Sequence, residues 1–154
     1  MSHIVLCVDD DKTVLNALRT LLTNTLPEGC RVEVAESGPE CIEVCQALEA
    51  EGLMPLMVIS DFIMPQMRGD ELLVRLHARY PSMIKVMLTG QADFAGVRRV
   101  INEASLYRFI DKPFKNADMV LTVKTAIEFK QTECDLRDEI THLKSRITEL
   151  EGQT

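Results

Sequence analysis

The sequence contains no apolar run long enough to span a membrane. Its longest runs, such as those at residues 4–8 and 56–59, fall far short of the roughly 18 residues that a membrane-spanning helix needs. The first residues also lack the basic start and the small-residue cleavage site of a secretory signal peptide. With 46% hydrophobic and 27% charged residues, the composition is typical of a soluble globular protein with one core. These features predict a cytoplasmic protein with no membrane partner.

Basic residues are in the minority, with 17 Lys and Arg against 24 Asp and Glu. This balance disfavours direct nucleic-acid binding, which depends on basic side chains that neutralise phosphates. The five cysteines form no CxxC pair, so neither a zinc site nor a disulfide framework is indicated. We expect inert, packed thiols, with Cys41 and Cys45 close enough on one helix to touch. We also expect His3, His77 and His142 to be solvated, because none has a partner at a recognisable spacing.

Short apolar runs alternate with longer segments of helical period. Five of the runs are predicted to be strands, at 4–8, 31–35, 56–60, 84–88 and 107–110. Between them, apolar residues recur at the spacing of amphipathic helices. We interpret Asp11 as the cap of the first helix, and Pro39 fits the first turn of the second. This alternation is typical of an α/β protein, in which helices cover both faces of a doubly wound, five-stranded parallel sheet.

No glycine or proline occurs between residues 114 and 151, so the last helix can continue beyond the sheet. Its apolar positions then follow a heptad with isoleucine at a and leucine at d, a combination that favours two parallel helices. The seam consists of Phe129, Leu136, Ile140, Leu143, Ile147 and Leu150. We therefore expect residues 129–154 to be a coiled-coil extension that forms a homodimer or leads to an output domain.

Charges beside this seam agree with a parallel dimer. In the heptad register, Glu139 faces Lys144 of a second copy, and Arg146 faces Glu151, so both pairs attract. Glu133 falls at an a position and weakens the seam near the folded domain. The alternative is a helix that folds back on its own domain, which gives no reason for the matched charges.

Acidic side chains stand at the carboxyl ends of two predicted strands. Asp9 and Asp10 follow the first strand, and Asp61 follows the third. In a doubly wound sheet these ends share the edge at which ligands bind, so the carboxylates are expected to converge. Close carboxylates repel one another unless a cation lies between them, and Mg²⁺ prefers such oxygen ligands. Dinucleotide or flavin binding is disfavoured, because the first strand is not followed by a glycine-rich loop.

Two phosphate-binding groups are predicted at the same edge. Thr89 follows the fourth strand with a hydroxyl, and Lys112 follows the fifth with an ammonium. An aspartate nucleophile, a divalent cation, a lysine and a hydroxyl donor are the groups that phosphoryl transfer to a carboxylate requires. The pattern predicts phosphorylation of an aspartate, with Mg²⁺ as cofactor.

The segments LCVDDD, VISDFIMPQMRGDELL, VMLTG and YRFIDKPF stand in this order along the chain. Over residues 3–128 the chain resembles the receiver domain of bacterial two-component response regulators, and it is similar to chemotaxis regulators. The resemblance implies a flavodoxin-like domain at 1–128 with strand order 2-1-3-4-5. It also implies a regulator rather than an enzyme, which receives its phosphoryl group from a sensor histidine kinase or a phosphotransfer protein. Its signal would pass through the fourth helix, fifth strand and fifth helix to a partner or an output domain.

The resemblance also assigns roles at the acidic edge. It implies that Asp61 is the phosphoacceptor and a metal ligand. Asp10 would bind the metal directly, and Asp9 would act mainly through water. The backbone carbonyl of Ile63 would complete the protein ligands.

Further roles follow from the resemblance on the last two strands. Thr89 would hydrogen-bond the phosphoryl group, and Lys112 would form a salt bridge with it. Phe109 matches an aromatic switch position that works together with Thr89. Pro113 follows Lys112 in a bond that the family usually holds cis.

The sequence departs from the commonest receiver pattern at two positions. Asp111 adds an acid beside Lys112, and Ile63 is apolar where many receivers are polar. Gln91, two residues past Thr89, is available to orient a water. A phosphohydrolase with an aspartyl-phosphate intermediate is disfavoured, because Ile63 occupies the position of its second acid. A pseudo-receiver that serves only as a dimerising scaffold is the other alternative, and the intact acidic set argues against it.

Overall fold

The computed structural model describes residues 3–90 and 94–152 of the chain. One sheet of five parallel strands has the order β2-β1-β3-β4-β5. The strands are β1 (His3–Val8), β2 (Cys30–Ala35), β3 (Met57–Asp61), β4 (Ile84–Thr89) and β5 (Arg108–Asp111). The expected doubly wound, flavodoxin-like sheet is confirmed, and each predicted strand lies within one residue of the observed one at both ends.

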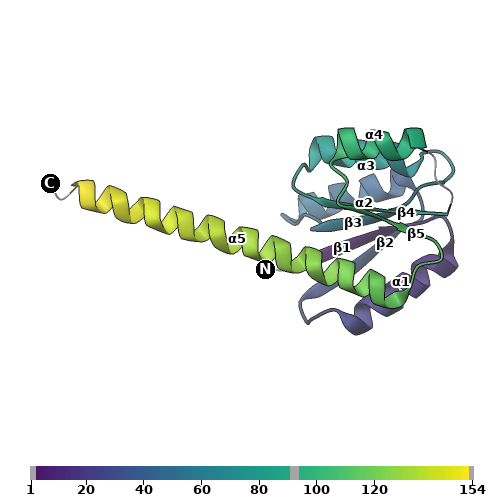
Figure 1. Cartoon of the computed structure of the whole chain (residues 1–154), viewed down its shortest axis with the longest axis horizontal. Coiled ribbons are helices and arrows are strands. Elements are labelled where there is room, and N and C mark those ends of the chain that lie inside the picture. Colours follow the sequence, from purple (N-terminus) through teal and green to yellow (C-terminus); the bar gives the residue numbers. More distant parts are fainter. Residues whose placement is uncertain (1–2, 91–93, 153–154) are drawn as a thin grey trace.

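Helices follow the strands and cover both faces of the sheet. They are α1 (Lys12–Thr25), α2 (Gly38–Ala50), α3 (Gly69–Arg79), α4 (Phe94–Ala104) and α5 (Asn116–Gly152). α1 and α5 lie on one face, and α2, α3 and α4 lie on the other (Figure 1). Two predicted helix starts are confirmed, since Asp11 accepts a hydrogen bond from the Thr13 amide at 2.9 Å and Pro39 lies in the first turn of α2.

The sheet is enclosed by two apolar layers. Side chains of β1 and β4 alternate between them: Leu6 and Met87 pack towards α2 to α4, whereas Val5 and Val86 pack towards α1 and α5. Every residue of β3 and β4 is buried, as near-continuous apolar runs predict for central parallel strands. The carboxyl ends of these strands therefore form a fixed edge.

The long helix α5 has two parts. Its first part buries Met119, Val123 and Ala126 against the sheet. From residue 135 to residue 152 every residue is exposed, and the helix extends away from the domain (Figure 1). The fold-back alternative is therefore wrong, while the dimer stays a prediction. None of the helices in the described ranges is long and apolar enough to cross a membrane.

The expectation that the histidines are solvated is wrong at His3, which is half-buried with its Nδ1 shielded from solvent, and at His77. This side chain of α3 is half-buried, and its Nδ1 lies 2.6 Å from the Nζ of Lys85 in β4. Lys85 is only 1% exposed, so its amine has to find partners inside the protein. His142 on the tail is exposed, as expected. The buried thiols of Cys41 and Cys45 are in contact, which was also expected.

Candidate functional site

The carboxyl edge of the sheet brings together the acidic residues that the sequence singled out. Asp9 directly follows β1, and Asp61 is the last residue of β3. Oxygen atoms of Asp9, Asp10 and Asp61 all lie within 4.8 Å of one another. Asp9 and Asp61 are buried, whereas Asp10 is exposed, so the cluster opens to solvent on one side. The predicted convergence of the carboxylates is confirmed.

Lys112 directly follows β5, the edge strand next to β4, and its side chain reaches this cluster. Its Nζ lies 2.8 Å from Asp9 Oδ2 and 3.1 Å from Asp61 Oδ1. The backbone helps to place it, because the Lys112 amide donates to the carbonyl of Thr89 at the end of β4. Lys112 and Pro113 are joined by a cis peptide bond, as the resemblance implied.

Ionisation of the cluster reflects both burial and charge. Burial raises the pKa of Asp61 above its ordinary value, the hydrogen bond from Lys112 opposes this, and the charge of Asp9 adds to it. Burial alone would lower the pKa of Lys112, but its contacts with Asp9 and Asp61 raise it overall. One ammonium thus faces three carboxylates. The remaining negative charge and the hard oxygen donors fit a Mg²⁺ ion.

The loop after Asp61 is held tightly against it. The Phe62 amide donates to Asp61 Oδ1 at 2.9 Å, and the Gly69 amide donates to the Phe62 carbonyl at 2.8 Å. A Cβ at position 69 would lie 2.1 Å from the Asp61 carbonyl oxygen, so only glycine fits there. The Phe62 amide thus holds the Asp61 carboxylate, and the close approach of Gly69 holds the backbone beside it.

Sequence reasoning missed the role of Phe62. Its ring is buried, and the guanidinium carbon of Arg68 lies 4.6 Å from the ring centroid. The ring also packs against the backbone of α4 at Gly96. No short motif marks this contact, because its members are more than thirty positions apart in the sequence. The residue after Asp61 therefore ties the acidic edge to α4.

The remaining predicted residues differ in exposure. Thr89 is buried at the end of β4, close to the edge of the sheet. Phe109 is 47% exposed and Ile63 is 63% exposed, so neither side chain is part of the hydrophobic core. Gln91 lies outside the described residues.

Comparisons with known sequences agree with this geometry. Residues 5–124 match the family described as the response regulator receiver domain. The hydrogenase transcriptional regulatory protein HoxA of Cupriavidus necator is 32% identical over 136 residues, which cover 86% of this chain and 26% of that protein. The sensor kinase CckA of Brucella abortus is 30% identical over 125 residues, covering 81% of this chain and 12% of the kinase. The chain thus spans about a quarter or less of these relatives.

Solved structures show the same likeness. The signal receiver domain of an HD domain-containing protein from Pseudomonas fluorescens Pf-5 has a TM-score of 0.75 at 28% identity, over 86% of this chain and 99% of that one. A CheY-like response regulator receiver domain protein from Methanospirillum hungatei JF-1 has a TM-score of 0.74 at 27% identity, with the same coverage. The chain therefore belongs to the response regulator receiver domains of two-component signalling, a family of regulatory phosphoacceptors.

Proposed function

We propose that Asp61 accepts a phosphoryl group from a histidine kinase or a phosphotransfer protein in the cytoplasm. The convergence of three carboxylates and one lysine on a single sheet edge carries this proposal. Asp9, Asp10, Asp61 and the carbonyl of Ile63 would hold Mg²⁺. The ion would neutralise phosphoryl oxygens that the carboxylates would otherwise repel.

Each side chain of the site has a separate role in phosphoryl transfer. An oxygen of Asp61 attacks the phosphorus of a phosphohistidine, and the P–N bond breaks as the new P–O bond forms. The departing imidazole takes up a proton from solvent. Lys112, already 3.1 Å from Asp61, pairs with the transferred group, and the Thr89 hydroxyl donates a hydrogen bond to it. Position and charge account for the reaction, with little covalent chemistry from the protein.

Intact-mass spectrometry with acetyl phosphate tests this assignment. We expect one added phosphoryl group in the presence of Mg²⁺, and none in EDTA or in Asp61→Asn. Asp111→Asn is the matched control, because Asp111 is an exposed acid that is not part of the cluster. Undiminished phosphorylation of Asp61→Asn would exclude Asp61 as the acceptor.

The same proposal gives Thr89 and Phe109 the role of a switch. When the phosphoryl group draws the Thr89 hydroxyl towards it, space opens for the exposed Phe109 ring to turn inward. Beryllofluoride, a phosphoryl mimic, should shift the NMR signals of Phe109 and of residues 94–104 in the parent. Asp61→Asn should show no such shift. Unchanged signals in the parent would remove Phe109 from the mechanism.

We also propose that the tail at 129–154 joins two receivers, each at 1–128, as a parallel homodimer. The seam residues from Leu136 to Leu150 are exposed apolar side chains on a helix that leaves the domain. Burying them against a second copy removes this surface from water. The attractive pairs between Glu139 and Lys144 and between Arg146 and Glu151 set the parallel orientation, although exposed pairs contribute little energy.

Sedimentation equilibrium tests the dimer. Ile140→Asp places a charge in the seam and should yield a monomer, as should truncation after Lys130. Thr141→Asp is the matched control, because this neighbouring exposed residue lies outside the seam, and it should leave the dimer intact. A full-length parent that is monomeric at tens of micromolar, with and without beryllofluoride, would refute the dimer.

Experiments also distinguish the two alternatives to a phosphoacceptor, a dimerising scaffold and a phosphohydrolase. A scaffold that merely dimerises would pass the sedimentation test and fail the phosphorylation test. A phosphohydrolase would release phosphate with multiple turnovers, and the apolar Ile63 offers no second acid for that reaction.

A further inference from the structure

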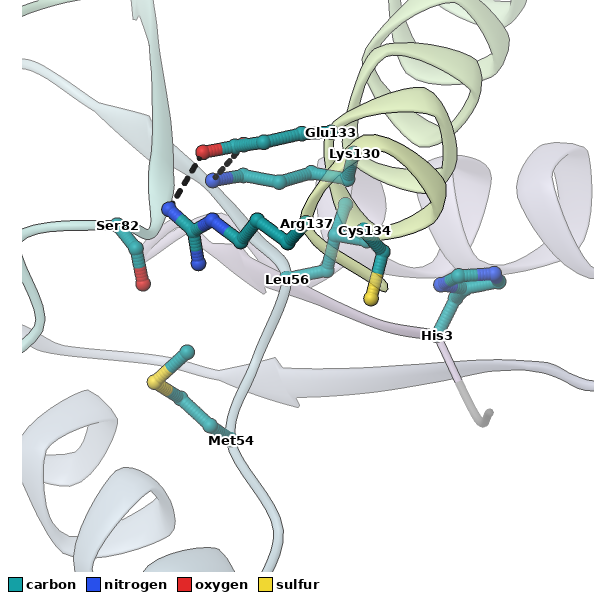
Figure 2. A pocket seen from close by; sticks show the side chains of 8 residues that line it. All are labelled: His3, Met54, Leu56, Ser82, Lys130, Glu133, Cys134 and Arg137. Carbon is teal, nitrogen blue, oxygen red and sulfur yellow. Dashed lines mark hydrogen bonds and ion pairs between the residues drawn. The ribbon is translucent and has the colours of Figure 1, made fainter. Parts of the chain in front are cut away.

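A small hollow lies at the sheet edge opposite Asp61, where α5 leaves the domain. It has a volume of about 170 Å³. Figure 2 shows side chains of α5 on one side and of the receiver on the other. We call it the root pocket, lined by His3, Leu56, Ser82, Lys130, Cys134 and Arg137. Anything that occupies it touches both the receiver and the tail.

Cations in the root pocket outnumber acids. Lys130 Nζ lies 3.3 Å from Glu133 Oε2, and Arg137 Nη2 lies 2.8 Å from Glu133 Oε1, so two cations share one carboxylate (Figure 2). His3 Nδ1 is buried, and it has no hydrogen-bond partner among the described residues. The pocket therefore holds two cations for one carboxylate, together with a buried imidazole nitrogen that no described group satisfies.

A further buried cation lies close to this pocket. Lys85 meets only neutral groups, with its Nζ 2.6 Å from His77 Nδ1 and 3.5 Å from the Pro81 carbonyl. It forms no ion pair within the part of the chain that the structure describes. Burial lowers the pKa of Lys85 to about 8, and the nearby charge of Lys130 contributes. This sheet edge therefore carries excess positive charge, with Lys85 and Lys130 largely screened from water and Arg137 open to it.

The other walls are apolar. Met54 and Leu56 precede β3, and with Cys134 they offer sulfur and methyl groups to an occupant. A molecule that suits the pocket combines a small apolar body with a negative group. A ring of about six carbons with one carboxylate suits a hollow of this volume.

We propose that the root pocket binds a small organic carboxylate between the receiver and the tail. The carboxylate accepts hydrogen bonds from Arg137 and Lys130 in place of Glu133, and the body packs on Leu56 and Cys134. Arginine and lysine bind carboxylates through charge-assisted hydrogen bonds. Because the ligand contacts both parts, it fixes the direction in which α5 leaves the domain.

NMR titration of the full-length chain in EDTA, with sodium benzoate as the probe, tests the proposal. Amide signals of Leu56, Ser82 and Cys134 should shift together and saturate, with a dissociation constant of about 1 mM, as expected for so small a ligand. Benzamide has the same body without the charge and should bind at least about tenfold more weakly.

Two variants should change the affinity in opposite directions. Arg137→Gln removes a carboxylate donor and should weaken benzoate binding by about tenfold. Glu133→Gln removes the competing carboxylate and should strengthen binding, which a purely structural role for Glu133 does not predict. Arg19→Gln and Glu149→Gln, both exposed and outside the root pocket and the charge pairs of the seam, are matched controls that should leave binding unchanged.

Several outcomes would overturn the proposal. These are shifts that stay linear up to about 50 mM benzoate, equal shifts with benzamide, or weaker binding in Glu133→Gln. Asp61→Asn should bind benzoate as the parent does, since the root pocket lies at the opposite edge. A failure of benzoate binding is therefore distinguishable from a failure of phosphorylation at Asp61.

Discussion

The ring of Phe62 occupies the space that a side chain at Gly96 would need. A Cβ placed on Gly96 would lie 2.3 Å and 2.6 Å from two carbons of that ring. Phe62 follows Asp61 directly and donates its amide to the Asp61 carboxylate. Phe62 therefore contacts both the Asp61 carboxylate and the backbone of α4. Glycine is unfavourable inside helices, and this contact explains why one nevertheless occurs at residue 96, in the first turn of α4.

Gly96→Ala should displace the Phe62 ring and lower the free energy of unfolding by about 1–3 kcal/mol. In a Phe62→Leu background the loss should be smaller, because the ring carbons that would clash are absent. Urea unfolding of the four proteins of this double-mutant cycle measures the coupling, which should be at least about 0.5 kcal/mol. Strictly additive effects would show that the two residues do not interact.

Lys112→Met should make the fold depend on divalent cations. Without the ammonium, Asp9 and Asp61 repel each other across a buried site, so the melting temperature in EDTA should fall by several degrees. Added Mg²⁺ should restore more stability to this variant than to the parent, because the ion no longer competes with a lysine. Thermal unfolding at several Mg²⁺ concentrations checks this. An equal Mg²⁺ response in both proteins would contradict the competition.

Ile63 should prolong the life of the phosphorylated state. Its side chain is 63% exposed two residues past Asp61, where a branched apolar group hinders the approach of water. We expect phosphate loss from the parent over many minutes or longer, and about tenfold faster loss from Ile63→Asn, whose amide can hold a water. Loss of added mass with time measures both rates. Equal rates would show that position 63 does not control hydrolysis.

Lys85 should destabilise the fold below about pH 8. Its folded pKa is lowered from 10.5 to about 8, first by burial and then by Lys130. Between these two pH values the unfolded chain binds more protons, so stability contributed by this group rises with pH. Lys85→Met should therefore be more stable than the parent at pH 7, by roughly 3 kcal/mol at most. Urea unfolding should show this advantage shrinking as the pH approaches 10.5.

Local patterns predicted most of the fold. The strands β3 and β4 are short apolar runs bounded by polar residues, and this signal places their ends to within one residue. The convergence of Asp9 and Asp61 follows from the same strand ends, because parallel strands align their carboxyl termini. The strands and the acidic edge of the sheet could thus be predicted, because residues close together in the sequence determine where each strand begins and ends.

Contacts between distant residues could not be predicted in this way. Lys85 interrupts an apolar run without any sign that His77 would meet its amine. The fit of Phe62 on Gly96 depends on the distance between β3 and α4, which no spacing along the chain encodes. The root pocket likewise exists only because α5 passes the ends of three separate segments.

The part of α5 that extends beyond the domain would convert a small tilt of the helix into a large displacement of its far end. From Lys130 to Leu150 the helix is about 30 Å long, at about 1.5 Å per residue. A tilt of about 10° at Lys130 would carry Leu150 sideways by about 5 Å, close to the pitch of one helical turn. A reorientation that displaces residues near the sheet by less than an ångström would therefore displace the far end of the tail by several ångströms.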